Sequence, residues 1–160
     1  MKPVNIIKLV ICCAVPLLAG VIGAIYTTHD SLDNWYADLN KPFFNPPDWI
    51  FGPVWTTLYI MMGIAAYLVW RKGLDDKVVR IALACFIVQL FLNAIWTPLF
   101  FGLRSPLLGL IDIVLLLNAI IVTIFAFFQI SRIAALLLIP YLAWVSFATV
   151  LNASIYLLNR

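Results

Sequence analysis

Three short stretches of the chain combine tryptophan with amide or hydroxyl side chains at spacings that place them together. If each stretch is a helix, residues three or four apart share one face. The three faces hold Trp55, Tyr59, Met62 and Ala66; Gln89, Asn93, Trp96 and Thr97; and Trp144, Ala148 and Asn152. Facing inward together, they would form an aromatic slot with a few hydrogen-bond donors, suited to a flat, mostly apolar ligand with a polar edge. The alternative is that the amides only join helices, at about 0.6 kcal/mol each.

Asp112 is the one charged residue inside the apolar part of the chain. A carboxylate at the centre of a membrane helix costs about 2.5 to 3.5 kcal/mol, so it must be protonated, hydrogen-bonded or in contact with water. Its candidate partners are Asn93, Asn118 and tyrosine hydroxyls. Asp112 therefore belongs either to a functional site or to a structural hydrogen bond between helices.

The chain has few side chains of the kinds that commonly act in hydrolysis or metal catalysis. The chain has no glutamate, His29 is its only histidine, and no nucleotide-binding or metal-ligand motif occurs. Cys12, Cys13 and Cys85 lack the spacing of a metal site or a disulfide framework. Hydrolysis by acid-base or nucleophilic chemistry is not supported, and we expect no metal site and no required cofactor.

The residues of the three faces, Asp112 and the three cysteines all lie within five apolar runs, each at least 18 residues long. They are Leu9 to Tyr26, Trp49 to Trp70, Ile81 to Leu103, Ser105 to Ser131 and Ile133 to Asn159. About 18 residues rising about 1.5 Å each cross the roughly 30 Å hydrocarbon core of a bilayer. Only 11% of the residues are charged, against about 25% in an ordinary soluble domain. The chain is therefore predicted to lie in a membrane.

The spans should be helices, because lipid cannot satisfy exposed backbone groups and barrel strands would alternate apolar and polar residues. We predict an all-α membrane bundle forming a single domain, 1–160, with transmembrane helices at about 5–27, 49–70, 78–102, 105–129 and 132–157. Ser105 and Ser131 should cap the helices that follow them. Pro16, Pro98 and Pro140 lie inside runs and should kink them.

The long connection between the first two helices, residues 28–48, contains four aspartates, the pair Trp35-Tyr36 and a proline cluster. Long ordered loops are commonly functional, so this segment is predicted to cover the mouth of the bundle as a lid. The alternative is an interfacial aromatic anchor of the kind common to membrane proteins.

Basic residues divide unequally between the two ends of the bundle. If the helices alternate in direction, seven of the ten lysines and arginines lie on the side of the N-terminus. The positive-inside tendency then predicts a cytoplasmic N-terminus. Which membrane the protein occupies is left open.

Three ordered blocks give the chain a recognisable pattern. They are residues 35–59 (WYxxLxKPxxxPPxWxFGPVWTxLY), 89–102 (QLxLNxxWTPLFFG) and 140–152 (PYLAWVSFATVLN). With five spans and this length, the chain resembles the TspO/MBR family, the tryptophan-rich sensory proteins that include mitochondrial translocator proteins, over essentially its whole length.

The resemblance implies a five-helix bundle, usually a homodimer, with a pocket beneath the first loop. That pocket would bind porphyrins or haem-like tetrapyrroles and, in some members, sterols or benzodiazepine-type ligands. The positions matching family pocket residues, with Tyr59 added from the first face above, are Tyr36, Pro46, Trp55, Tyr59, Asn93, Trp96, Asp112, Trp144 and Ala148. His29 is interpreted as a solvated loop residue, with axial ligation of a bound haem as the alternative.

Three functions remain open at this point. The first is a membrane receptor or carrier that binds tetrapyrroles, or another hydrophobic ligand, and regulates their transport or availability. The second is a light- and oxygen-dependent porphyrin-degrading enzyme in which Trp55 and Trp144 are catalytic. The third is a scaffold for a partner protein. In each case the bilayer is the expected environment, and no nucleic acid is an expected partner.

Two observations temper the tetrapyrrole interpretation. The acidic loop would repel porphyrin propionates unless they reach Lys41, Arg104 or Arg160, and salt only partly screens this repulsion. The cholesterol motif of animal translocator proteins is absent, because Ala153 and Leu157 occupy its tyrosine and arginine positions. Sterol recognition is therefore not assigned.

Overall fold

A computed structural model describes residues 3–33 and 35–160, with side chains described for residues 5–27 and 35–160. Within these residues the chain is helical and contains no strand. Five segments are long and apolar enough to cross a membrane, which confirms the predicted fold class. They are Asn5–Thr27, Asp48–Trp70, Lys77–Gly102, Pro106–Phe128 and Arg132–Leu158.

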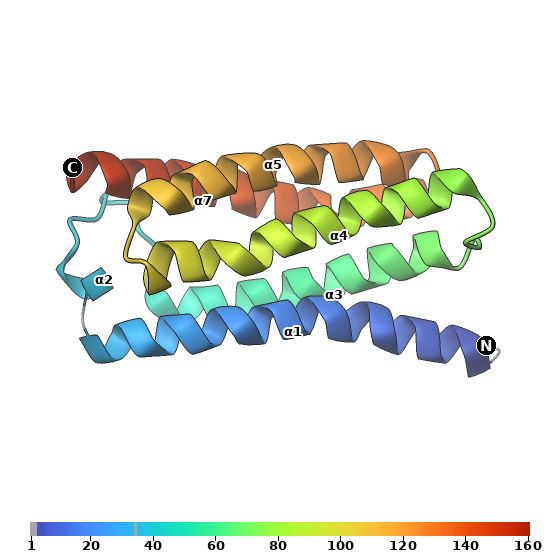
Figure 1. Ribbon diagram of the computed structural model, residues 1–160, viewed down its shortest axis with the longest axis horizontal. Helices are drawn as coiled ribbons and strands as arrows, with labels where there is room; N and C mark the ends of the chain where they lie inside the picture. Colours follow the sequence, from blue (N-terminus) through green and yellow to red (C-terminus); the bar gives the residue numbers. More distant parts are fainter. Residues whose placement is uncertain (1–2, 34) are drawn as a thin grey trace.

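The spans are built from eight α-helical or related elements, and they lie side by side with their long axes roughly parallel (Figure 1). The α-helices are α1 (Pro3–Asp33), α3 (Phe51–Trp70), α4 (Lys77–Thr97), α5 (Pro106–Phe128), α6 (Arg132–Leu137) and α7 (Ile139–Leu158). A 3₁₀ turn, η1 (Asp48–Ile50), precedes α3, and a π-helical segment, η2 (Pro98–Gly102), follows α4. A short helix, α2 (Trp35–Asp38), lies outside the spans.

The first helix is longer than the sequence suggested. Helix α1 continues to Asp33 instead of ending near residue 27, so the first part of the predicted loop is helical. The remaining connection, residues 35–50, crosses one end of the bundle and carries α2 and η1 (Figure 1). We call residues 35–50 the lid segment.

Serine caps and prolines set the helix boundaries. The Ser105 hydroxyl accepts a hydrogen bond from Leu108 N at 3.2 Å, and the Ser131 hydroxyl accepts one from Ala134 N at 3.3 Å, as predicted for N-caps. At Pro98 the helix changes to the wider π form, with Leu103 N donating to Pro98 O at 2.9 Å. The break before Pro140 divides the fifth span into α6 and α7.

Small residues let α1 pack closely on its neighbours. A Cβ at Gly63 of α3 would lie 2.6 Å from the Cys13 Cα, so this glycine permits backbone contact between α1 and α3. Gly20 of α1 abuts the Tyr59 ring, and Gly23 abuts the Thr97 hydroxyl. Gly20 and Gly23 of α1 thus make close contacts within the chain, and the homodimer stays a prediction.

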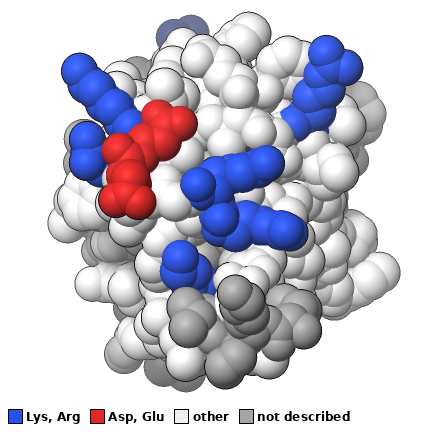
Figure 2. Space-filling model, turned by 90° about the vertical axis from the view of Figure 1, so that its right-hand side faces the viewer, with Lys and Arg blue, Asp and Glu red and all other residues white. Residues whose placement is uncertain are grey.

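The end of the bundle opposite the lid is basic. Arg71 and Lys72 follow α3, Lys77 and Arg80 lie in the first turn of α4, and Arg132 begins α6; all five are exposed. Figure 2 shows lysine and arginine side chains gathered on this face beside a small acidic patch. The lid lies at the other end, with the C-terminus (Figure 1).

Candidate functional site: an aromatic pocket under the lid

A pocket of about 1310 Å³ lies between the helices at the lid end of the bundle. Drug-sized ligands usually occupy pockets of about 300 to 1,000 Å³, so this one can take a large ligand. Its lining comes from α1, α3, α4, η2, α5, α7 and the lid segment. All five membrane spans therefore contribute to one site.

The pocket lies where α3 and α7 do not pack closely on each other. Helix α3 packs against α6, whereas α7, after the break before Pro140, packs mainly on α5. Aromatic side chains bridge the resulting space. Phe51 meets Trp144 edge-to-face at 5.8 Å between ring centroids, and Trp55 meets Tyr141 at 6.3 Å. The proline break thus helps to shape the site.

Three indole rings line the pocket from three different helices: Trp55 on α3, Trp96 on α4 and Trp144 on α7. Trp55 stacks on Tyr59, with ring centroids 5.4 Å apart and an interplanar angle of 26°. Trp96 stacks on Phe100 at 5.0 Å. These rings give the site broad apolar faces, which favour stacking by a planar ligand.

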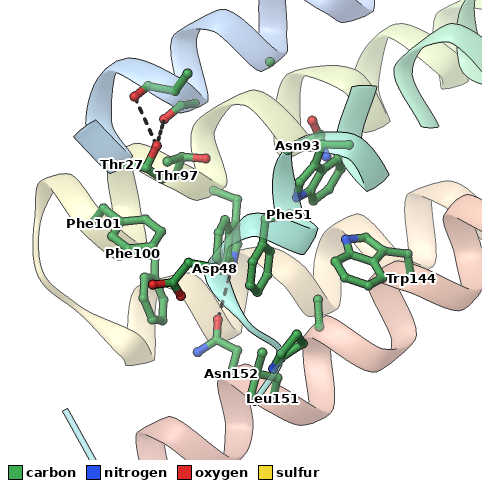
Figure 3. Close-up of a pocket in the computed structure, with 18 of the residues that line it drawn as sticks. Thr27, Asp48, Phe51, Asn93, Thr97, Phe100, Phe101, Trp144, Leu151 and Asn152 are labelled. Atoms are coloured by element: carbon green, nitrogen blue, oxygen red, sulfur yellow. Dashed lines mark hydrogen bonds between the residues drawn. The ribbon is translucent and has the colours of Figure 1, made fainter. Parts of the chain in front are cut away.

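The amides that share faces with these rings tie helices together. The Tyr59 hydroxyl donates to Asn93 Oδ1 at 2.9 Å, joining α3 to α4. The Trp96 indole N–H donates to Asn152 Oδ1 at 3.3 Å, and Asn152 Nδ2 donates to Pro106 O at 2.8 Å. Asn93 and Asn152 nevertheless line the pocket, and Figure 3 shows them on opposite sides of it. Both amides therefore join helices, and both also line the pocket.

Trp144 presents an uncommitted donor. Its Nε1 is buried and has no hydrogen-bond partner among the described residues. Buried polar groups normally have partners, and an unpaired one costs roughly 1 to 3 kcal/mol. Trp144 lines the pocket from α7, facing the side on which Phe51 and Asn93 lie (Figure 3). A bound molecule with an acceptor atom could satisfy this N–H after a small adjustment of the ring.

Asp112 does not line the pocket, although its neighbour one residue along, Ile113, does. Its side chain is only 3% exposed, and Oδ2 has no hydrogen-bond partner among the described residues. Asn118, one of the candidate partners, is exposed and donates to Val114 O of its own helix at 2.7 Å. The structure therefore places Asp112 within the bundle behind the pocket wall.

The lid segment lines one end of the pocket with Tyr36, Lys41, Asn45, Pro46 and Asp48. The Tyr36 hydroxyl donates to Asn45 Oδ1 at 3.1 Å, and the Lys41 ammonium lies 4.7 Å from the centre of the Tyr36 ring. Lys41 also donates to Ala37 O at 3.0 Å. Among the described residues that line the pocket, Lys41 is the cation and Asp48 is the carboxylate.

Eight of the nine candidate site residues line this single pocket, Asp112 being the exception. Met62 and Ala66 share a helix face with Trp55 but are buried in the core outside the lining. Several lining aromatics were not predicted: Phe51, Phe100 and Phe101. Phe51 precedes Trp55 by one helical turn and could have been found by extending that face. The two phenylalanines follow Pro98 in the π segment, where α-helical spacing no longer applies.

No group of three or more His, Cys, Asp or Glu residues that could hold a metal ion occurs in the described part of the chain. The His29 side chain lies outside the described residues. The three cysteines have free thiols. What the site offers is binding through ring faces, a few polar atoms and a charged mouth.

The molecule is thus a helical membrane protein with five spans, all of which contribute to a tryptophan-lined pocket beside the lid segment. Comparison with known proteins gives the particular family. The sequence model of the TspO/MBR family matches residues 12–158, and the chain belongs to this family.

Curated relatives match along nearly their whole length. The chain is 48% identical over 156 residues to the tryptophan-rich protein TspO of Archaeoglobus fulgidus, covering 97% of this chain and 99% of the relative. It is 43% identical over 143 residues to the human translocator protein, covering 88% and 83%. The tryptophan-rich sensory protein of Cereibacter sphaeroides is 40% identical over 139 residues, covering 86% and 85%. Family membership and the five apolar helices identify a multi-pass membrane protein.

Proposed function

We propose that this protein binds porphyrin or haem-like tetrapyrroles, or another hydrophobic ligand, in the pocket and regulates their transport or availability. The main support for this proposal is the large pocket, which Trp55, Trp96 and Trp144 line from three different helices. A macrocycle offers two apolar faces for stacking and a polar edge for hydrogen bonds. The unpartnered Trp144 N–H would be one donor to that edge.

The charged mouth fits an amphipathic ligand with carboxylates at one edge. Lys41 is the described basic side chain in the lining, and Asp48 is the described acidic one. A ligand bound with its ring among the indoles would place propionates near Lys41, with Asp48 opposing them. We therefore expect propionate binding to be modest and sensitive to salt.

The test is a porphyrin titration followed by quenching of tryptophan fluorescence, in the dark and without oxygen. Trp55→Phe combined with Trp144→Phe should weaken binding at least tenfold, because two stacking surfaces and one donor are reduced, at about 0.5 to 1.5 kcal/mol each. Trp49→Phe is the matched control, since Trp49 is 74% exposed and does not line the pocket. Equal affinity for the double variant and the control would contradict the proposal.

A second candidate, degradation of a bound porphyrin by light and oxygen, has one specific observation in its favour. Trp55 stacks on Tyr59, whose hydroxyl donates to Asn93, so an oxidisable indole lies beside a hydrogen-bonded phenol. Illumination in air after the dark titration separates the two functions. Loss of the porphyrin absorbance band that depends on Trp55 and Trp144 would support an enzyme, whereas an unchanged band supports binding alone.

The same purified protein can be used to distinguish a scaffold role from ligand binding and from porphyrin degradation. It would be favoured if the purified protein bound no porphyrin and retained a stoichiometric protein partner. Homodimerisation is proposed from the family resemblance and is tested by light scattering of the protein in detergent, where the mass of two chains is expected.

A further inference from the structure

Asn159, which directly follows the last residue of α7, forms hydrogen bonds with both the backbone N–H and the backbone C=O of one lid residue, Asn40. Asn159 Oδ1 accepts a hydrogen bond from Asn40 N at 2.9 Å, and Asn159 Nδ2 donates to Asn40 O at 2.9 Å. The same Nδ2 donates to Ile155 O, in the last turn of α7, at 2.8 Å. The amide is therefore held on the helix while it engages both backbone polar groups of Asn40.

The residue that Asn159 engages is central to the lid. Asn40 directly precedes Lys41, which lines the pocket, and lies five residues before Asn45, which the Tyr36 hydroxyl holds. The lid also packs on the bundle through apolar side chains. Tyr36 and Trp35 meet phenylalanine rings of η2, Phe44 meets Phe147 of α7, and Leu39 packs against the cluster of Phe100, Leu151 and Ile155. Apolar contacts of this kind are weakly directional, whereas a reciprocal pair of hydrogen bonds requires one position and one orientation.

We propose that Asn159 fastens the lid segment over the pocket and thereby sets how fast a pocket ligand enters and leaves. The part that concerns the ligand rests on the proposed function; the fastening itself does not. Opening the lid must break both hydrogen bonds to Asn40. A neutral hydrogen bond in water shifts an equilibrium by roughly twofold to tenfold, so loss of the pair should increase lid opening about fivefold or more.

The chain offers a matched set of variants. Asn159→Ala removes both hydrogen bonds to the lid, whereas Asn40→Ala removes none, because Asn40 takes part only through its backbone. Asn159→Asp keeps an acceptor for the Asn40 N–H but loses the donor and places a carboxylate oxygen against the Asn40 carbonyl. Asn159→Ala and Asn40→Ala both shorten an asparagine to alanine, but only Asn159→Ala should loosen the lid.

The first measurement is amide hydrogen exchange of the ligand-free protein in lipid nanodiscs. We expect the amides of residues 38–45 to exchange about fivefold faster in Asn159→Ala and in Asn159→Asp, with α5 unchanged. Asn40→Ala should exchange at the wild-type rate. Wild-type exchange in Asn159→Ala, or equal acceleration in Asn40→Ala, would overturn the fastening.

The second measurement is the release and uptake of protoporphyrin IX, followed by stopped-flow tryptophan fluorescence. Both rate constants should rise about fivefold in Asn159→Ala, and the equilibrium affinity should change less than either rate. If Asn159→Ala instead disturbed only the pocket lining, porphyrin affinity would fall and the uptake rate constant would not rise. If amide exchange in the lid were faster in Asn159→Ala but porphyrin uptake and release were unchanged, the proposal that Asn159 sets the ligand rates would be wrong. If the wild type bound no porphyrin, the proposed function would fail, and the exchange comparison would still decide the fastening.

Discussion

A single methyl group at Gly20 should damage the pocket through Tyr59. An ideal Cβ at Gly20 would lie 2.5 Å from Cε2 and 3.0 Å from Cδ2 of the Tyr59 ring. An ordinary carbon contact is about 3.5 to 4.0 Å, so the ring would have to move by roughly 1 Å. It has little freedom to do so, because it is buried, stacks on Trp55 and donates to Asn93.

The size of the effect follows from two opposing contributions. Overpacking of this kind costs about 1 to 3 kcal/mol, and replacing glycine by alanine inside a helix returns up to about 1 kcal/mol. We expect Gly20→Ala to lower the free energy of unfolding by up to about 3 kcal/mol. Porphyrin binding should weaken threefold to tenfold, since displacing Tyr59 disturbs the stacked Trp55 face, worth about 0.5 to 1.5 kcal/mol.

A second pocket glycine supplies the control. Gly52 also lines the pocket, but a Cβ there would meet nothing within 4 Å. Gly52→Ala should leave unfolding unchanged or raise its free energy by up to about 1 kcal/mol. Equilibrium unfolding in mixed micelles and porphyrin titration measure the two effects on the same preparations.

A double-mutant cycle tests whether the Tyr59 ring causes the loss of stability in Gly20→Ala. In a Tyr59→Ala background the ring is absent, so Gly20→Ala should cost nothing, which gives a coupling of about 1 to 3 kcal/mol between the two positions. The explanation is wrong if Gly20→Ala costs the same with and without the Tyr59 ring. It is also wrong if Gly52→Ala is as damaging as Gly20→Ala.

Three further predictions concern charges. Asp112→Asn should keep or raise the thermal unfolding temperature, because Oδ2 has no hydrogen-bond partner among the described residues; a large drop would reveal a partner for the carboxylate. Lys41→Gln should weaken binding of a dicarboxylic porphyrin about threefold at low salt, and Asp48→Asn should strengthen it similarly, whereas the porphyrin dimethyl ester should respond to neither. In a variant without native cysteines, Lys72→Cys should react with an impermeant maleimide only from the cytoplasmic side and Arg104→Cys only from the opposite side; the reverse pattern would refute the predicted orientation.

The five spans could be predicted because lipid imposes a simple requirement on length and polarity. The serine caps at Ser105 and Ser131 were predictable for a similar reason, since each has one local partner. The end of α1 was not predictable in this way. Residues 28–33 include polar side chains that hydropathy assigns to a loop, yet the helix continues to Asp33. Hydropathy predicts which residues lie in the hydrocarbon core, but a helix can continue past the membrane surface.

The pocket itself could be predicted only in part. The helical spacing of Trp55 and Tyr59 identified an inward face, but Met62 and Ala66 on that face are buried in the core. The difference arises from the separation of α3 and α7 near the lid, which is a property of tertiary packing. A pattern of side chains on one helix contains no information about the distance to another.

The hydrogen bonds also change which atoms we expect a ligand to use. The spacing suggested that amides would meet its polar edge, but Asn93 Oδ1 and Asn152 Oδ1 already accept hydrogen bonds from Tyr59 and Trp96. Using those acceptors for a ligand would weaken bonds that hold helices together, whereas the Trp144 N–H can be used without breaking any described bond. The site should therefore prefer ligands that present an acceptor toward α7, and Trp144→Phe should reduce that preference more than Trp96→Phe does.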